Sequence, residues 1–472
     1  MRFYLIAKAL DKKYFICGLL SISLLAATWQ KAYALSGITL TNKDKILILA
    51  PHPDDEAVGT GGIIQKAVGL GVPVKVVYLT NGDNNELAFL VYKKHPILDK
   101  RGLLKMGETR RQEALGAMRS LGLQEPQLIF LGYPDFGTSE IFTKYWGSSR
   151  PFKSMLSRVT AVPYRESFSY KALYKGENVL NDIKKILLDF QPTKIFVTLP
   201  ADTNPDHRAF YLFLQVALWD LDGKIPTPEV FPYIIHVVGW PLPRGFHPEL
   251  SLDAPESLTE LNWWTSSLAP DEIEKKKEAI DHYKSQISYA PEYLYTFDRK
   301  NEMFARFNDI LLQESGGDIA WEDYVSRQQI VSRLANDEKQ NRKIIQSVAY
   351  AQQNGKLLIR LIVNNWESKL SGINLFLIGY KKDNDFPRMP KIRLNINFDR
   401  FVSVYNGLTR IIIKDMKFSH SKNVLLMEVP LSALGNPNRI LTSLKTNIAD
   451  WPLEATEWRT LNVDNSANAT NK

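Results

Sequence analysis

Cysteine is nearly absent from this chain. Its 472 residues contain one cysteine, Cys17, which lies in an apolar stretch close to the N-terminus. The rest of the chain has no disulfide and no thiolate that could act as a nucleophile or a metal ligand. A transition-metal site in this protein must therefore be built from His, Asp and Glu side chains.

A strong charge of one sign is also missing. The chain has 59 basic and 51 acidic residues, a formal net charge of +8. Residues 1–34 hold five of the basic residues and one of the acidic residues, which leaves 54 and 50 in the remainder, a net charge of +4. A nearly balanced surface argues against nucleic acid as a partner.

Long apolar runs are absent after the first residues. A basic start is followed by the apolar run Tyr14–Thr28 and by the small-residue sequence Ala32-Tyr33-Ala34. This pattern is typical of a signal peptide, so we expect residues 1–34 to be removed and the protein to be exported to the periplasm or the cell exterior. The alternative is an uncleaved N-terminal anchor, although the run is short for a span of about 20 residues. We expect no other membrane contact.

Residues 40–315 alternate short apolar runs with helical segments. Apolar runs without period-2 alternation, each followed by a helix, are typical of a mainly parallel sheet that is covered on both faces. The sequence therefore predicts a Rossmann-like three-layer α/β/α domain. No G-x-G-x-x-G follows the first strand, which disfavours dinucleotide binding. The expected strands are Lys45–Ala50, Val74–Leu79, Gln127–Leu131, Lys194–Leu199 and Tyr233–Val238, and the expected helices are Gly62–Val68, Glu108–Leu121, Glu177–Phe190, His207–Leu218 and Asp271–Gln286.

A second domain is expected over residues 345–465. Residues 316–344 read as a linker, with a helix over Trp321–Arg342, and residues 466–472 as a disordered tail. Asn354-Gly355 and Asn406-Gly407 are strong hairpin signals, and they favour an antiparallel β-sandwich that serves as an interaction module. The expected strands are Ser347–Gln353, Lys356–Val363, Ile373–Gly379, Lys391–Asn397, Phe401–Tyr405, Leu408–Lys414, Val424–Pro430 and Trp458–Val463.

Two loops that follow expected strands are rich in metal ligands. Pro51–Glu56 (PHPDDE) follows the first strand, and Pro200–His207 (PADTNPDH) follows the fourth. Carboxyl ends of parallel strands meet at one edge of a sheet, so His52, one Asp of the pair and His207 should form a triad. Three protein ligands with an open position are typical of catalytic zinc, and the second Asp would take a proton from the bound water.

Several motifs resemble those of the PIG-L/LmbE family of zinc-dependent N-deacetylases, which act on GlcNAc-type substrates. The most specific are PHPDDE and the Pro-Asp-His that ends at His207. The matching positions run in order from Lys45 to Phe307. They further include Arg110-x-x-Glu113, Leu131-Gly132-Tyr133-Pro134-Asp135, His236-x-x-Gly239-Trp240-Pro241 and Lys284-Ser285-Gln286.

The resemblance implies a role for each matching residue. It makes Asp54 the general base and Asp206 a partner of the adjacent metal ligand. The cofactor would be one Zn²⁺, and Fe²⁺ or Co²⁺ could replace it. The implied metal ligands are His52, Asp55 and His207, and the implied substrate-binding residues are Arg110, Asp135 and His236.

One position departs from the family pattern. The family has His-Pro-Asp-His in the second loop, and here Asn204 replaces the first His. An Asn amide can donate a hydrogen bond to an oxyanion, but it cannot supply a proton near neutral pH. Asp54, Asp202 and His236 are the candidates for that proton.

The resemblance implies a hydrolase of linear amide bonds, and the signal-peptide pattern implies that it is exported. It would remove acetyl from an N-acetylated amino sugar in a glycan or glycoconjugate. Two alternatives stay open at this point. One is another metal-dependent amide or ester hydrolase, and the other is a non-catalytic glycan-binding protein with a degenerate site.

Overall fold

The computed structural model describes residues 35–84, 99–330, 332–334, 344–364, 371–397, 402–448 and 451–464. The expected signal peptide and the expected C-terminal tail lie outside these ranges. Contacts group residues Gly37–Lys472 into one compact unit. Within the described ranges, no helix combines the length and the apolar character needed to cross a membrane.

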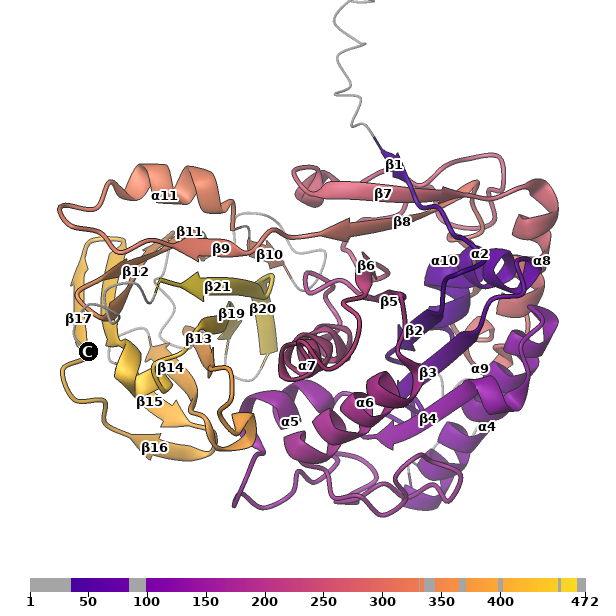
Figure 1. Ribbon diagram of the computed structural model, residues 1–472, viewed down its shortest axis with the longest axis horizontal. Coiled ribbons are helices and arrows are strands. Elements are labelled where there is room, and N and C mark those ends of the chain that lie inside the picture. Colours follow the sequence, from indigo (N-terminus) through magenta and orange to yellow (C-terminus); the bar gives the residue numbers. More distant parts are fainter. Residues whose placement is uncertain are drawn as a thin grey trace, which may run out of the picture. The chain divides into compact units, whose positions relative to one another are not determined.

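A mainly parallel sheet forms the centre of the first domain (Figure 1). Its strands follow the order β7-β8-β6-β5-β2-β3-β4, in which β6-β5-β2-β3-β4 pair in parallel and β7 and β8 pair antiparallel. The strands are β2 (Ile46–Ala50), β3 (Val74–Thr80), β4 (Leu128–Tyr133), β5 (Lys194–Thr198), β6 (Glu229–Tyr233), β7 (Asn262–Ser267) and β8 (Asn301–Arg306), and the short β1 covers Ser36–Gly37.

Helices cover both faces of this sheet, as the sequence predicts. Ile46 and Ile48 of β2 belong to one apolar core, and Leu47 and Leu49 to the other. The first core lies under α2, α4 and α8, and the second under α5, α6 and α7, so the domain has three layers. The helices are α2 (Asp55–Gly69), α4 (Lys100–Ser120), α5 (Thr138–Lys144), α6 (Gly176–Phe190), α7 (Pro205–Asp220), α8 (Pro270–Ile280), α9 (Lys284–Ile287) and α10 (Pro291–Tyr295), with 3₁₀ turns at Glu125–Gln127 and Glu256–Leu258.

Two elements of the first domain differ from expectation. The strand expected over Tyr233–Val238 lies four residues earlier, as β6 (Glu229–Tyr233), and shares only Tyr233 with the expected range. It ends there because the amides of Ile235 and His236 donate to the carboxylate of Asp202 and not to a strand. The single helix expected over Asp271–Gln286 is broken into α8 and α9. Tyr283 has non-helical dihedrals (φ −79°, ψ 59°), and its hydroxyl donates to Glu56.

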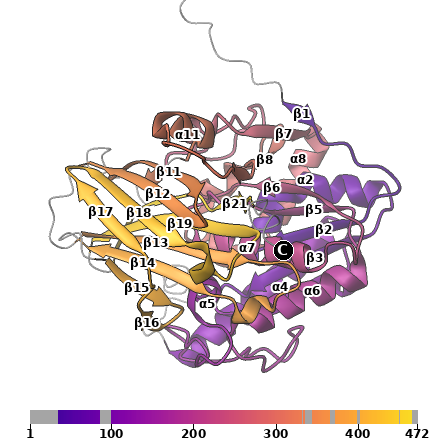
Figure 2. The same cartoon turned by 60° about the vertical axis from the view of Figure 1, so that its left-hand side comes forward.

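The second domain consists of two sheets packed face to face (Figures 1 and 2). One has the order β10-β20-β19-β13-β14-β15-β16, with β21 beside β19 and β9, and the other has the order β11-β12-β18-β17. The strands are β9 (Ile310–Leu312), β10 (Ser332–Leu334), β11 (Ile345–Gln353), β12 (Lys356–Val363), β13 (Ser371–Tyr380), β14 (Lys391–Asn397), β15 (Val402–Asn406), β16 (Thr409–Ile411), β17 (Lys417–Ser421), β18 (Val424–Pro430), β19 (Arg439–Ile448), β20 (Trp451–Thr456) and β21 (Arg459–Val463), with 3₁₀ turns at Phe386–Arg388 and Leu431–Leu434.

The expected antiparallel sandwich is confirmed, with one parallel exception between β9 and β21. Both hairpins form where expected, and Asn354 (φ 51°) and Gly355 (φ 69°) make the left-handed turn that their sequence favours. The helix expected over Trp321–Arg342 is shorter. Its described part, α11 (Trp321–Gln328), ends where Gln329 adopts a left-handed conformation (φ 48°), and β10 follows.

The β-sandwich packs directly against α5, α6 and α7, and α7 carries His207 of the expected site. Trp458 and Leu441 belong to the same apolar core as α5, α6 and α7. The amide of Trp458 donates to the carbonyl of Pro200 (3.1 Å), at the start of the second ligand-rich loop. The loop that precedes α7 is therefore held from the second domain as well as from the first.

Candidate metal and active site

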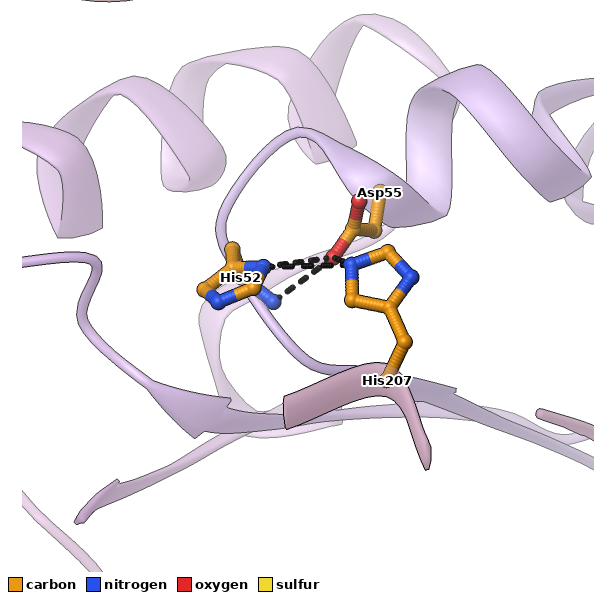
Figure 3. A group of neighbouring side chains, drawn as sticks. All are labelled: His52, Asp55 and His207. Carbon is orange, nitrogen blue, oxygen red and sulfur yellow. Dashed lines mark hydrogen bonds and ion pairs between the residues drawn. The ribbon is translucent and has the colours of Figure 1, made fainter. Parts of the chain in front are cut away.

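The two ligand-rich loops meet at the carboxyl edge of the sheet, as their sequence positions predict. Strands β2 and β5 are parallel neighbours, so the turn after Ala50 and the loop after Thr198 leave the sheet side by side. Figure 3 shows His52, Asp55 and His207 facing one another across this edge. All three side chains are buried.

Three acceptor atoms of this triad converge. The Oδ2 atom of Asp55 lies 3.1 Å from Nδ1 of His52 and 3.1 Å from Nε2 of His207. The two ring nitrogens lie 3.3 Å apart. Ligand atoms around a tetrahedral zinc ion with bonds of about 2.0–2.1 Å are about 3.3 Å apart, so the spacing fits such an ion.

Further carboxylates lie next to the ring nitrogens of the two histidines that face away from Asp55. Nδ1 of His207 lies 3.1 Å from Asp202, and Nε2 of His52 lies 3.1 Å from Asp135 and 3.4 Å from Asp206. A metal ion held by Asp55 would need the lone pairs of the two ring nitrogens that face Asp55, so the nitrogens toward Asp135, Asp206 and Asp202 would then carry the protons. That is the arrangement of a carboxylate–histidine–metal site.

The electrostatics of the triad favour a positive charge at its centre. Burial opposes charge on His207, but Asp202 and Asp55 outweigh it and raise the pKa of His207 to about 9. Burial also lowers the pKa of His52, but Asp135, Asp206 and Asp55 outweigh it and raise that pKa well above its ordinary value. A proton or a divalent cation can occupy this position, and metal binding would displace the protons.

Asp54 lies beside the triad and makes a different set of contacts. Burial raises the pKa of its carboxyl to about 7, and the charge of Arg110 limits the rise. The two side chains are 3.1 Å apart at Arg110 Nη2 and Asp54 Oδ2. A buried carboxyl that titrates near neutral pH suits a general base. Asp54 also has a φ of 135°, a strained backbone of the kind found at functional sites.

Arg110 is buried and its guanidinium contacts the turn itself. Nη2 also donates to the carbonyl of Pro53 (2.7 Å), and Nη1 donates to the carbonyl of Gly82 (3.2 Å). Gly82 (φ 64°) lets the guanidinium approach, because a Cβ there would collide with it. Arg110 thus holds Asp54 in place at the cavity wall, and contact with sugar hydroxyls stays a prediction.

Asp135 and Asp206 join two loops behind His52. Asp206 accepts from the amide and hydroxyl of Thr138 and from the amide of Phe136. Asp135 accepts from the amide of Asn84 (3.0 Å) and faces His52. The structure therefore places Asp206 beside His52 and not beside the adjacent His207, where the sequence predicted it, because Asp202 takes that position. It places Asp135 against His52, at the cavity wall where a substrate contact was predicted.

Asn204 caps the helix that carries His207. Its Oδ1 accepts from the amide of Asp206 (2.9 Å), which makes Asn204 the N-cap of α7. This bond fixes the amide group, so the Nδ2 side is the hydrogen-bond donor that remains.

A cavity of about 430 Å³ opens onto these residues. It brings together Asp54, Arg110, Asp135, Asn204 and His236 of the predicted site, whereas His207 and Asp206 lie outside its lining. The opposite wall comes from α9, α10 and the residues between them. Gln286 of the motif Lys284-Ser285-Gln286 belongs to this wall, whereas no sequence pattern indicated its other residues. The described lining is His52, Asp54, Asp55, Val58, Arg110, Asp135, Phe136, Asn204, Ile235, His236, Gln286, Tyr289, Ala290, Tyr293 and Leu294.

The third acid of the hexapeptide, Glu56, has a role that the sequence did not reveal. It is fully buried, and it accepts from the amide of Asp54 (3.1 Å) and from the hydroxyl of Tyr283. Burial raises the pKa of Glu56 to about 8. Glu56 therefore anchors the strained turn at Asp54 to Tyr283.

Comparison with known proteins identifies the same region. Residues 47–218 match the sequence model of the PIG-L family, described as GlcNAc-PI de-N-acetylase. Both ligand-rich loops lie inside this match. A curated relative, 1D-myo-inositol 2-acetamido-2-deoxy-alpha-D-glucopyranoside deacetylase 1 of Saccharopolyspora erythraea, is 28% identical over 195 residues. That alignment covers 40% of this chain and 57% of the relative, little more than half of its length.

Two solved structures are similar at a lower level. A conserved protein of Thermus thermophilus is 24% identical, with a TM-score of 0.32 over 53% of this chain and 83% of the other. N,N'-diacetylchitobiose deacetylase of Pyrococcus horikoshii is 20% identical, with a TM-score of 0.33 over 55% of this chain and 82% of the other. The family match and the motifs within it are the stronger findings. Over residues 47–218, the α/β domain of this chain is similar to the PIG-L family.

Proposed function

We propose that this protein is an exported, metal-dependent deacetylase that removes acetyl from an N-acetylated amino sugar. The observation that carries the proposal is the convergence of three acceptor atoms of His52, Asp55 and His207 beside the buried carboxyl of Asp54. The family match supports it, and so does the sugar deacetylase activity stated in the name of the curated relative. Residues 1–34, with the pattern of a signal peptide, support export.

His52, Asp55 and His207 would hold a Zn²⁺ ion, which Fe²⁺ or Co²⁺ could replace. Such an ion polarises an acyl carbonyl and makes bound water more acidic. The protein groups around it carry out the proton transfers. Asp54 accepts a proton from the attacking water, and Arg110 holds its carboxylate in position.

The remaining steps also fall to residues at the cavity wall. The Nδ2 group of Asn204 donates to the carbonyl oxygen as negative charge develops there. Asp54 then returns its proton to the nitrogen as the C–N bond breaks, so water and amide become acetic acid and a free amine, which exchange a proton at neutral pH to give acetate and an ammonium group. The pKa of about 7 for Asp54 allows both transfers.

Replacing the base tests this assignment. In Asp54→Asn, acetate release from N-acetylated sugars should fall by a factor on the order of 10² or more, because proton transfer is lost. Metal content, measured by elemental analysis, should stay near the wild-type value, since Asp54 is outside the triad. Asp189→Asn is the matched control, because Asp189 is an exposed residue of α6. Wild-type turnover in Asp54→Asn would show that the mechanism is wrong.

Asn204, which stands where the family has a histidine, favours a second candidate function: a glycan-binding protein with a degenerate site. Asn204→His restores the family residue, so an enzyme weakened at this position should gain rate by a factor on the order of 10². The change also removes a helix cap worth about 1 kcal/mol, so folding must be checked by thermal melting. If neither form releases acetate while both bind acetylated sugars, the binding role is the better description.

A further inference from the structure

His236 and Tyr293 form a hydrogen-bonded pair on the cavity wall. The hydroxyl of Tyr293 lies 2.8 Å from the carbonyl of Ile235 and 2.9 Å from Nδ1 of His236. A carbonyl can only accept, so the hydroxyl proton points to Ile235. The hydroxyl oxygen then accepts from His236, which places the imidazole proton on Nδ1.

The ring of His236 is also fixed in orientation. It lies parallel to the ring of Tyr293, at an interplanar angle of 7°, with centroids 5.7 Å apart. On the other side it approaches the ring of His207, at 4.8 Å between centroids. Its backbone amide donates to Asp202 (2.9 Å), and its carbonyl accepts from the amide of Thr203 (3.0 Å). The side chain is therefore held from both sides and from its own backbone.

Nε2 of His236 is the ring atom left for a ligand. Within the part of the chain that the structure describes, it has no hydrogen-bond partner, and it is not among the buried atoms that lack one. His236 lines the cavity together with Asn204. Because Nδ1 carries the proton, Nε2 offers a lone pair and acts as an acceptor.

We infer that His236 makes the site selective for amides over esters. The cavity wall then presents one donor, the Nδ2 group of Asn204, and one acceptor, Nε2 of His236. The hydrogen bond from Thr203 to His236 ties the two segments together. A secondary amide has a carbonyl that accepts and an N–H that donates, so it satisfies both groups. An O-acetyl ester lacks the N–H and leaves the lone pair of His236 unpaired, which a buried site penalises.

This inference rests on the proposed function and names the acyl linkage on which that site acts. In this inference the neutral ring of His236 is a hydrogen-bond acceptor. His236 is therefore not the proton donor that takes over from the family histidine replaced by Asn204. Tyr293 is a positioning residue. Its hydroxyl accepts from Nδ1 of His236 and so sets the tautomer of His236, and it does not bind the substrate amide itself.

The experiment compares kcat/KM for an N-acetylated sugar with kcat/KM for the matching O-acetylated sugar. In His236→Phe, the amide-to-ester ratio should fall about 10- to 100-fold, as expected for loss of a buried hydrogen bond to substrate. Tyr293→Phe should reduce the same ratio by a smaller factor, because both tautomers become accessible. Tyr170→Phe, at an exposed tyrosine outside the cavity, should leave the ratio unchanged. An unchanged ratio in His236→Phe would overturn the inference, as would loss of the metal in that variant.

A second measurement does not depend on turnover. In the full-length protein labelled with ¹⁵N-histidine, the Nε2 resonance of His236 should have the shift of an unprotonated nitrogen and should change in Tyr293→Phe. A protonated Nε2 in the wild type overturns the inference even if the enzyme is active. If neither acetylated sugar is cleaved by the wild type, the proposed function fails, and the ¹⁵N spectrum still decides the tautomer.

Discussion

Arg208 should stabilise both the fold and the metal triad, because it joins the second ligand-rich loop to the β-sandwich. It follows His207 directly and is largely buried. Its Nε donates to the carbonyl of Asp202, and its Nη1 donates to the carbonyl of Thr456 (2.9 Å). The guanidinium of Arg208 thus links two segments: the loop that orients His207, and the last residue of β20.

The expected cost of Arg208→Met follows from these contacts. A hydrogen bond from a charged donor contributes about 1.5–3 kcal/mol. The carbonyl of Thr456 would still accept from the hydroxyl of Ser443 (3.0 Å), which reduces the cost at that end. The two bonds share one side chain, so their sum is an upper limit, and we expect a loss of about 2–4 kcal/mol in the free energy of unfolding. Metal affinity should fall by about 10-fold, the lower end of the range for partners of metal ligands, because Arg208 acts through Asp202.

Chemical denaturation and a chelator competition titration measure the two effects. Arg208→Lys keeps the charge and one donor, so it should recover part of both losses. The control is Arg388→Met, because the Arg388 side chain is 86% exposed and pairs with a neighbour on the surface. If Arg208→Met unfolds at the wild-type denaturant concentration and releases its metal at the wild-type chelator concentration, the β-sandwich does not support the site in this way.

Two further predictions concern charge in buried places. Asp202→Asn should lower metal affinity by about 10- to 100-fold, because Asp202 accepts the proton of His207 Nδ1 in the metal-bound site. Isothermal titration calorimetry with Zn²⁺ measures this affinity. Equal affinities in the variant and the wild type would contradict this assignment of the His207 proton. Burial lowers the pKa of Lys391 to about 7 in the folded protein, against 10.5 for an ordinary lysine. Between these values the unfolded chain binds more protons, so stability should rise from pH 7 to pH 9, and Lys391→Met should show a smaller rise in urea midpoint. An equal rise in both proteins would mean that Lys391 is not responsible.

The regular elements could be predicted because their burial is uniform along the sequence. Every residue of β2 is buried, as a continuous apolar run indicates, and Asn354-Gly355 forms the left-handed turn that its backbone preferences favour. The end of β6 could not be predicted in the same way. Residues 234–238 are as apolar as a strand, but Asp202 captures the amides of Ile235 and His236. A carboxylate more than thirty positions away decides where that strand ends.

The candidate site was predictable to the extent that sheet topology determines it. Two loops after parallel neighbouring strands must share an edge, which brought His52 and His207 together from the sequence alone. The supporting contacts do not follow from topology. Asp135 faces His52, and Tyr293 arrives from a short helix whose sequence carries no distinguishing pattern. These contacts depend on side-chain directions that are set only after the domain has packed.

The position of Asn204 has a consequence for the proposed mechanism. Its Oδ1 atom caps α7, and its Nδ2 group can donate a hydrogen bond but cannot release a proton at neutral pH. His236 presents a lone pair in the inferred tautomer, so it does not supply the proton either. Among the described carboxyl groups that line the cavity, Asp54 is the one whose contacts do not include a histidine. The proton that Asp54 takes from water must then be the proton that leaves with the amine, and a single residue would act first as base and then as acid.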